Sequence, residues 1–248
     1  MSARPAVPKG ARGVALVAVL WVVAALTLMV AGVMHGTRAE VRAVSAQRQI
    51  VVGAAQADGA LALVLRQWRL PGTPPVRSAV RLPVSFDGVD MEVQAYPLTG
   101  FVDPNTAQPA LLAAVFEIAG QLDKARATEL ADAVFAARDQ PEYKAAGRRF
   151  AAVEDLLQVP GIDYDIYRQV AGLLSVDDRS GGRVNPMAAP IEVLTVLTGG
   201  DAAAAETFAQ AREVSDIDAQ TWNMNPDFIG RNAGSRYLFV VSVPLADG

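Results

Sequence analysis

An uncharged run near the N-terminus constrains this chain more than any other feature. Residues 14–34 (VALVAVLWVVAALTLMVAGVM) are interrupted only by Thr27 and Gly32. As a helix this run is about 31 Å long, which matches the hydrocarbon core of a bilayer. A cleaved secretory signal has a hydrophobic core of roughly 7–15 residues and ends in a small-x-small site, which Val33-Met34-His35-Gly36 does not supply. We therefore expect a retained membrane-spanning helix.

Charge is distributed asymmetrically about this run. Residues 1–13 carry Arg4, Lys9 and Arg12 with no acid, whereas the rest of the chain holds 19 Lys and Arg against 26 Asp and Glu. The basic leader predicts a cytosolic N-terminus, with the C-terminal part across the membrane, which in a bacterium is the periplasm. The acidic remainder disfavours binding to the phosphates of nucleic acid.

The composition also excludes the common catalytic centres. The chain has no Cys, and its single His is His35. Disulfides, thiolate zinc sites and a Cys nucleophile are therefore excluded. A single His also makes a Ser-His-Asp triad improbable and cannot form a multi-His metal centre. We expect a protein that is not an enzyme.

Helical character continues past the membrane, because no Pro occurs between Pro8 and Pro71. The expected helix runs to Arg69, although Gly53 and Gly59 each weaken it by about 1 kcal/mol. Apolar residues at helical spacing predict one packing face. This face consists of Val41, Val44, Val51, Ala55, Ala62 and Leu65.

Three strands are predicted around a mostly helical middle. Val80 to Phe86 and Val89 to Tyr96 flank Asp87-Gly88, a dipeptide suited to a two-residue hairpin turn. Arg236 to Val243 alternates as a third strand. Because a hairpin is marginal alone, we expect one antiparallel sheet of all three strands, packed on the N-terminal helix. The chain between Gly100 and Gly234 would then be a helical insertion.

This insertion contains an internal repeat. Residues 102–112 align without a gap on residues 184–194, at an offset of 82. Each copy predicts an extended segment followed by a helix start, capped in the first copy by Asn105 or Thr106. The prolines expected in the first helical turns are Pro109 and Pro190. Neither copy offers a nucleophile, a base and an orienting group together, so a structural role is favoured.

Between the copies, Val159-Pro-Gly-Ile162 looks like a helix-hairpin-helix, a module that in many proteins grips DNA phosphates with backbone N–H groups. Here Asp163 stands where such modules place a second Gly. Residues 150–178 hold six acids against one base, Arg168. That charge repels phosphate, so packing or protein contact is the favoured use of the hairpin.

Taken together, these motifs resemble the minor pseudopilin K (GspK) family of the bacterial type II secretion system. The matching segments are Arg12-Gly-Val-Ala-Leu16, Gly100-Phe-Val-Asp-Pro-Asn-Thr-Ala107, Leu130-Ala-Asp-Ala133 with Arg138-Asp139, Arg149-Phe-Ala-Ala-Val-Glu-Asp-Leu156, Val159-Pro-Gly-Ile162 and Val184-Asn-Pro186. The first is shared by all type IV pilin-like proteins, whereas the combination is more specific. The resemblance covers nearly the whole chain.

The resemblance implies an α+β fold: a pilin-like long N-terminal helix and a small antiparallel sheet, with a large inserted α-helical domain of the helix-hairpin-helix or SAM-like type. The expected parts are a prepilin leader (1–13), a transmembrane helix (14–36), the pilin-like helix and β-hairpin (37–100), the inserted helical domain (101–234) and the C-terminal strand (235–248). The acidic, Gly-rich stretch that family members usually carry after Arg138-Asp139 is missing, which predicts a compact helical domain.

The resemblance also implies a function. Prepilin peptidase would cleave between Gly13 and Val14 and methylate the new N-terminus of Val14. The product would be a single-pass protein of the bacterial inner membrane with its C-terminal domain in the periplasm. It would cap the pseudopilus tip beside minor pseudopilins I and J and above the major pseudopilin, and so aid export of folded proteins. Ala18 replaces the Glu of most pilin-like subunits, as is usual in the K family, and suits a tip position.

Members of this family can bind calcium, which takes six to eight oxygen ligands. The best local candidates are Asp163, Asp177 and Asp178, although they form no recognisable loop pattern, and no other cofactor is expected. Three alternatives stay open, one of which, a periplasmic enzyme, would need a polar cleft that the sequence does not supply. A minor pilin of a related type IV pilus should lack the repeat and the insertion, and an exported helix-hairpin-helix DNA-binding protein should have a basic hairpin.

Overall fold

The computed structural model of the chain describes residues 11–69, 77–138, 150–176, 181–214, 222–232 and 234–244. Within the N-terminal helix, it describes the side chains of residues 16–29 and 44–68. The chain divides into two compact units, which are Met1–Gln56 with Pro244–Gly248 and Ala57–Val243.

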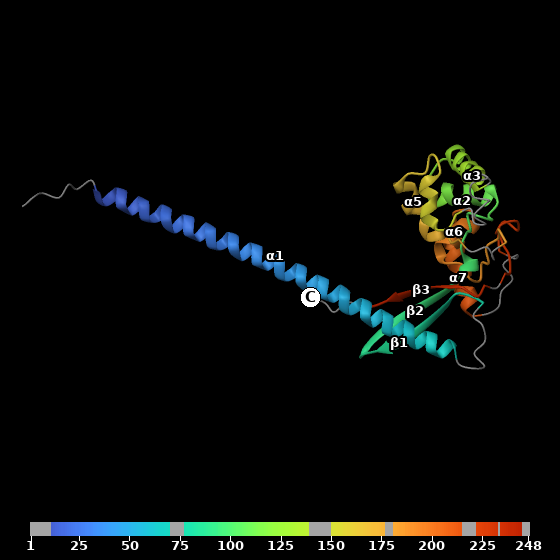
Figure 1. Ribbon diagram of the computed structural model, residues 1–248, viewed down its shortest axis with the longest axis horizontal. Helices are drawn as coiled ribbons and strands as arrows, with labels where there is room; N and C mark the ends of the chain where they lie inside the picture. Colours follow the sequence, from blue (N-terminus) through green and yellow to red (C-terminus); the bar gives the residue numbers. More distant parts are fainter. Residues whose placement is uncertain are drawn as a thin grey trace, which may run out of the picture. The chain divides into compact units, whose positions relative to one another are not determined.

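A single long helix, α1 (Ala11–Trp68), opens the described part of the chain (Figure 1). It continues through Gly53 and Gly59, because no proline removes a backbone donor between Pro8 and Pro71. The large apolar side chains between Leu16 and Met29 are 56–75% exposed. Within the first unit, the described side chains therefore do not bury this apolar surface.

The second unit contains a three-stranded antiparallel sheet of β1 (Val80–Phe86), β2 (Val89–Pro97) and β3 (Tyr237–Ser242), in the order β1-β2-β3. Asp87 and Gly88 form the two-residue turn between β1 and β2, with φ angles of 52° and 73°. The hairpin, the C-terminal strand and the α+β architecture with its long N-terminal helix are thus confirmed. A short 3₁₀ helix, η1 (Leu98–Gly100), leads out of β2.

The C-terminal part of α1 packs on one face of this sheet. Ala60 and Val64 are 0% and 3% exposed and lie in one apolar cluster with Met91 and Val93 of β2. At the end of the helix, the ring of Trp68 lies 5.1 Å from that of Tyr237 and 5.4 Å from that of Phe239. Fully burying a side chain such as Val64 stabilises the fold by about 1.5–2 kcal/mol.

The apolar face predicted for this helix does not pack on the sheet, as far as its described side chains show, and Val41 lies outside them. Val44 and Val51 are 67% and 63% exposed, and Ala62 is exposed as well. The face that packs on the sheet instead contains Gly59, where a Cβ would overlap the ring of Phe86. The glycine that weakens an isolated helix thus permits close contact between this helix and the sheet.

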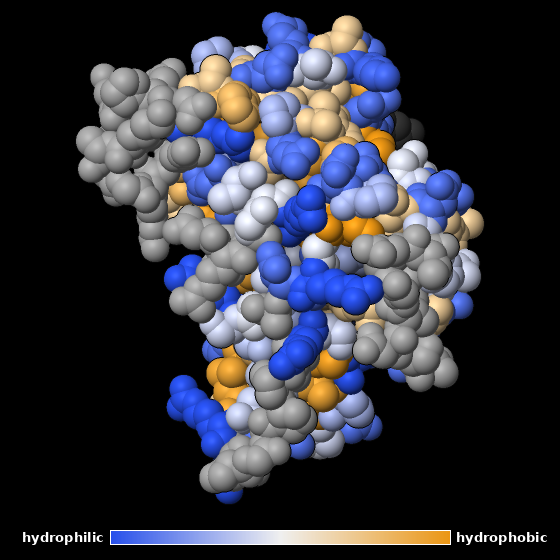
Figure 2. Space-filling view, turned by 90° about the vertical axis from the view of Figure 1, so that its right-hand side faces the viewer, coloured by the Kyte–Doolittle hydropathy of each residue, from blue (hydrophilic) through white to orange (hydrophobic). Residues whose placement is uncertain are grey.

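Helices occupy the chain between β2 and β3 (Figure 1). They are α2 (Pro109–Ile118), α3 (Lys124–Arg138), η2 (Val153–Gln158), α5 (Tyr164–Val170), η3 (Ala171–Leu173), α6 (Ile191–Leu197) and α7 (Ala202–Val214). We call residues 101–234 the helical head. On the face in Figure 2, hydrophilic side chains cover much of the described surface, with apolar ones between them.

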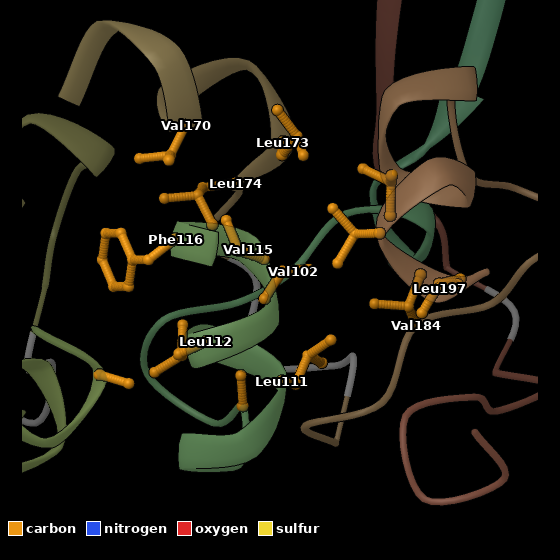
Figure 3. Packing of buried hydrophobic residues seen from close by; sticks show 14 of the residues in the cluster. Val102, Leu111, Leu112, Val115, Phe116, Val170, Leu173, Leu174, Val184 and Leu197 are labelled. Atoms are coloured by element: carbon orange, nitrogen blue, oxygen red, sulfur yellow. The ribbon is translucent and has the colours of Figure 1, made fainter. Parts of the chain in front are cut away.

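The helical head has its own hydrophobic core, with α2 at its centre (Figure 3). Leu111, Leu112, Val115 and Phe116 of α2 are each 1% exposed. Because these residues follow one another at helical spacing, α2 contacts α3, α5 and α6. The head is therefore a packed structural body organised around the buried face of α2.

Candidate functional site

The internal repeat forms two helical hairpins in the head. The first copy leads into α2 and α3, and the second leads into α6 and α7. Each copy starts at a valine in an isolated parallel β-bridge: Val102 pairs with Leu174, and Val184 pairs with Ile229. Equivalent positions thus make equivalent long-range contacts, which supports the structural interpretation of the repeat.

The residue after each valine organises the turn that follows. Oδ1 of Asp103 accepts a hydrogen bond from the N–H of Asn105 at 2.9 Å. Oδ1 of Asn185 accepts one from the N–H of Met187 at 3.1 Å, at the same offset in the second copy. Both copies therefore use an Asx turn, which a side-chain oxygen two residues upstream closes.

The predicted helix caps need correction. Gln108 is the N-cap of α2 and makes no side-chain capping bond, so neither Asn105 nor Thr106 caps this helix. Asn105 is instead buried and bonds both the carbonyl and the N–H of Phe150, at 3.0 and 2.8 Å. Pro109 lies in the first turn as predicted, whereas Pro190 is the N-cap of α6. Tertiary contacts to a distant segment outweigh the local capping preference here.

Two arginines, whose contacts the sequence pattern did not predict, each bond the start of one repeat copy. Arg138, at the end of α3, donates from Nη1 to the carbonyl of Ala107 at 2.6 Å. Arg212, in the last turn of α7, donates to the carbonyl of Ala189 at 2.7 Å and to that of Pro186 at 2.6 Å. Ala107 and Ala189 are equivalent in the repeat, but the arginines are 74 rather than 82 residues apart. The ungapped alignment of the two repeat copies therefore does not pair these two arginines.

The second copy also joins the head to the sheet. The N–H of Asn185 donates to the carbonyl of Thr99 at 2.7 Å, and its side-chain amide donates to the carbonyl of Asn232 at 3.1 Å. The same amide lies 3.5 Å from the carbonyl of Arg77. One buried residue, Asn185, thus contacts three segments: the one that enters β1, the one that leaves β2 and the one that returns to β3.

Close backbone contact strengthens this junction. A Cβ on Gly100 would overlap the main chain of Ala188, so only glycine allows the sheet exit to lie against the second repeat. The N–H of Ala79 donates to the carbonyl of Met187 at 2.9 Å. Nothing in the sequence pattern other than Gly100 itself signals this contact.

A small polar cavity beside the junction is lined by Ala79, Val80, Arg81, Tyr96, Arg212 and Glu213. Burial lowers the pKa of Arg212 to about 10, partly offset by Tyr96 and Glu213, so this guanidinium stays protonated at neutral pH. Burial likewise raises the pKa of Tyr96. Arg81 and Glu213 form an exposed ion pair at 3.5 Å, which contributes little. The polar groups that line this cavity come from both the sheet and the head, so they can bond the two parts to each other.

The predicted helix-hairpin-helix is formed by η2, the turn at Pro160-Gly161, and α5. Oδ1 of Asp163 accepts the N–H of Ile166 at 2.9 Å and caps α5. Nη2 of Arg126 donates to the carbonyl of Gly161 at 2.9 Å, so α3 holds the hairpin from one side. Asp163 and Asp165 remain exposed, which keeps negative charge at the hairpin.

The calcium prediction meets only one described residue, Asp163. Its carboxylate already bonds the start of α5, and Asp177 and Asp178 lie outside the described residues. Among the residues that the structure describes, no three His, Asp or Glu side chains group to hold a metal ion. Because calcium takes six to eight oxygen ligands and two of the three candidates are not described, the site stays a prediction.

The predicted processing residues, Gly13 and Val14, lie in the first turns of α1, where the structure describes backbone only. By length and composition, the described residues hold one helical stretch able to span a membrane, Val44–Trp68, and a shorter apolar stretch, Leu16–Met29. Val44–Trp68 contains three charged residues and packs partly on the sheet. Residues 14–34 contain no charge.

No protein-family model matches the chain, and no curated protein matches it. Among solved structures, the chain is similar to one in the crystal structure of the GspK-GspI-GspJ complex from the enterotoxigenic Escherichia coli type 2 secretion system. The TM-score is 0.45 and the identity 15%, over 84% of this chain and 89% of that chain. At these values the fold assignment rests on the helix, sheet and head described above.

Proposed function

We propose that this chain is a minor pseudopilin of a type II secretion system, which caps the tip of the periplasmic pseudopilus. One observation carries the proposal. A long N-terminal helix exposes its apolar first part and packs its last part on a small sheet, and a helical head is inserted between the last two strands of that sheet. The motif resemblance found in the sequence supports the same assignment.

The first part of α1 serves as a membrane stem in this proposal. Its large apolar side chains are more than half exposed, and residues 14–34 are long enough to cross a bilayer. Lipid would cover this surface before assembly, and neighbouring helices would cover it afterwards. The chain is then a single-pass protein of the bacterial inner membrane with its head in the periplasm.

The buried polar residues of the head support a role without catalysis. Asp103, Asn105, Arg138 and Asn185 all bond turns or main-chain groups of the head. Such bonds hold a shape, and none of them orients a nucleophile. We infer that the head acts as a rigid cap, with its second repeat fixed to the sheet at Asn185.

Ala18 supports a first or tip position. Most pilin-like subunits have Glu here, and a carboxylate within lipid is costly unless it is paired. In those subunits it is thought to meet the N-terminal amine of a neighbour. Without it, this chain cannot dock beneath an existing subunit through that contact. The proposed partners are therefore minor pseudopilins I and J at the tip and the major pseudopilin below.

Sequencing the N-terminus of the membrane-extracted protein tests the proposal. We expect a mature chain that starts at a methylated Val14, produced by prepilin peptidase. Gly13→Val should block cleavage, whereas Gly10→Val, a matched change within the leader, should leave it intact. A native chain that starts at Met1 or beyond Gly36 would identify an ordinary anchor or a secretory signal and contradict the proposal.

A further inference from the structure

The two edges of the sheet differ in what they offer to another strand. The N–H of Leu98 donates to the carbonyl of Arg236 at 2.9 Å, which fixes the hydrogen-bonding phase between β2 and β3. Because bonded pairs alternate in an antiparallel ladder, Leu238 and Val240 bond β2. The main-chain groups of Phe239 and Val241 therefore point to the free edge of β3.

The same alternation sets the phase of β1. Its two-residue turn makes Phe86 and Val89 a bonded pair, so Arg81, Pro83 and Ser85 point their main-chain groups away from β2. Pro83 has no N–H, and proline on a free edge is a common defence against unwanted pairing. The free edge of β3 has no such defence, since residues 237–242 include neither proline nor charge.

The side chains beside the β3 edge are also apolar. On the face that points away from α1, Leu238 and Val240 are each 42% exposed. Their neighbours on β2 are polar: the hydroxyl of Tyr96 donates to Gln94 at 2.6 Å, and Gln94 donates to Glu92 at 2.6 Å. The exposed apolar strip thus lies at the edge of the sheet, next to main-chain donors and acceptors that no described strand pairs with.

We propose that the free edge of β3 pairs with a β-strand of a different protein subunit, whose apolar side chains cover Leu238 and Val240. Alternating N–H and C=O groups along an extended edge are matched by an extended backbone, and neither a helix nor a lipid surface supplies such a pattern. The inference rests on the proposed function, which places partner subunits beside this head.

A second copy of this chain is a poor occupant of the edge. Two β3 edges paired about a two-fold axis would point the Ala57–Trp68 parts of their α1 helices in opposite directions, whereas the proposed function needs all heads to face away from the same membrane. Head-to-tail pairing would place β3 against the free edge of β1, where Pro83 removes a donor. Because both ways of pairing two copies meet an obstacle, a different protein is the favoured partner.

Site-specific photo-crosslinking of the full-length chain tests the inference. The photoreactive residue benzoylphenylalanine replaces Val240 at the β3 edge or, as the matched control, Ser85 at the β1 edge. The chain is co-expressed with minor pseudopilins I and J of the same organism. We expect an adduct with one of them from position 240, at a yield at least about fivefold above that from position 85. Equal yields, or an adduct of two copies of this chain, would overturn the inference.

Co-isolation in detergent separates this inference from the proposed function. Leu238→Lys with Val240→Lys should lower recovery of the pseudopilin partners about tenfold, whereas Ser85→Lys should leave recovery unchanged. Unaltered tryptophan fluorescence would show that the double variant is folded. Full recovery with the folded double variant contradicts edge pairing alone. If even the wild-type chain recovers neither partner, the proposed function fails and this inference fails with it.

Discussion

The two ends of α1 share one helix and a largely apolar composition, but their surroundings differ. Between Leu16 and Met29 the large apolar side chains are 56–75% exposed, whereas Ala60 and Val64 are almost completely buried against the sheet. One end is covered within the chain, whereas the other is exposed, and in the proposed function a membrane or neighbouring helices cover it. Apolar composition thus predicts a helix, but not what covers it.

The largest predicted effect concerns the first part of α1. Val22→Arg with Leu26→Arg places two charges within residues 14–34, at a cost of roughly 2.5–3.5 kcal/mol each at the centre of a membrane helix. We expect the variant to leave the membrane pellet after alkaline carbonate extraction, while the wild-type protein stays.

The matched control places the same charges further along the helix. Val44 and Val51 are 67% and 63% exposed, so Val44→Arg with Val51→Arg should remain in the pellet. The reverse result, release of the control alone, would assign the span to Val44–Trp68 and remove the contrast between the two ends of α1.

A second prediction asks how much the buried bonds of Arg212 stabilise the second repeat, the part of the head that joins the sheet. Arg212→Met removes the bonds to the carbonyls of Pro186 and Ala189 and should cost about 3 kcal/mol. Urea unfolding of the detergent-solubilised protein measures this loss. Arg168→Met, an exposed control, should stay within about 0.5 kcal/mol of wild type. Equal losses would show that the bonds of Arg212 do not stabilise the second repeat.

The third prediction sharpens the contrast within α1 itself. Val64→Ala removes two methyl groups from the cluster with Met91 and Val93 and should cost about 2 kcal/mol in the same urea experiment. Leu63 is 41% exposed, so Leu63→Ala should cost less than about 1 kcal/mol. If both variants lost the same stability, the burial assigned to this part of α1 would be wrong.

The smallest effect concerns a helix cap. Asp163→Ala removes the bond to the N–H of Ile166 and should cost about 1 kcal/mol. Asp165 lies two residues after Asp163, in the first turn of α5. The variant Asp165→Ala should therefore cost only a few tenths of a kcal/mol. Urea unfolding midpoints compare the two variants. If Asp163→Ala left the midpoint unchanged, the capping role of Asp163 would be excluded.

The sequence predicted the elements whose signals are local. The three strands followed from alternation, and the hairpin turn followed from Asp87-Gly88, because both depend on neighbouring residues. The repeat marked the starts of two helical hairpins, since proline and an Asx residue act within a few positions. The α+β class followed from joining these elements with the long N-terminal helix.

Contacts between distant residues were not predictable in the same way. Arg138 and Arg212 reach back to carbonyls 31 and 23 residues earlier, and no local pattern signals this distance. The face of α1 that packs on the sheet was not predicted, because the ring of Phe86 lies against Gly59, a contact that hydrophobicity does not reveal. Asn105 bonds Phe150 rather than capping α2 for the same reason.

Secretion after deletion of the gene tests the central claim most directly. We predict that proteins normally secreted across the outer membrane accumulate, folded, in the periplasm of the deletion strain. The full-length gene should restore their appearance in the medium, and the variant with Val22→Arg and Leu26→Arg should not. Undisturbed secretion in the deletion strain would contradict the account.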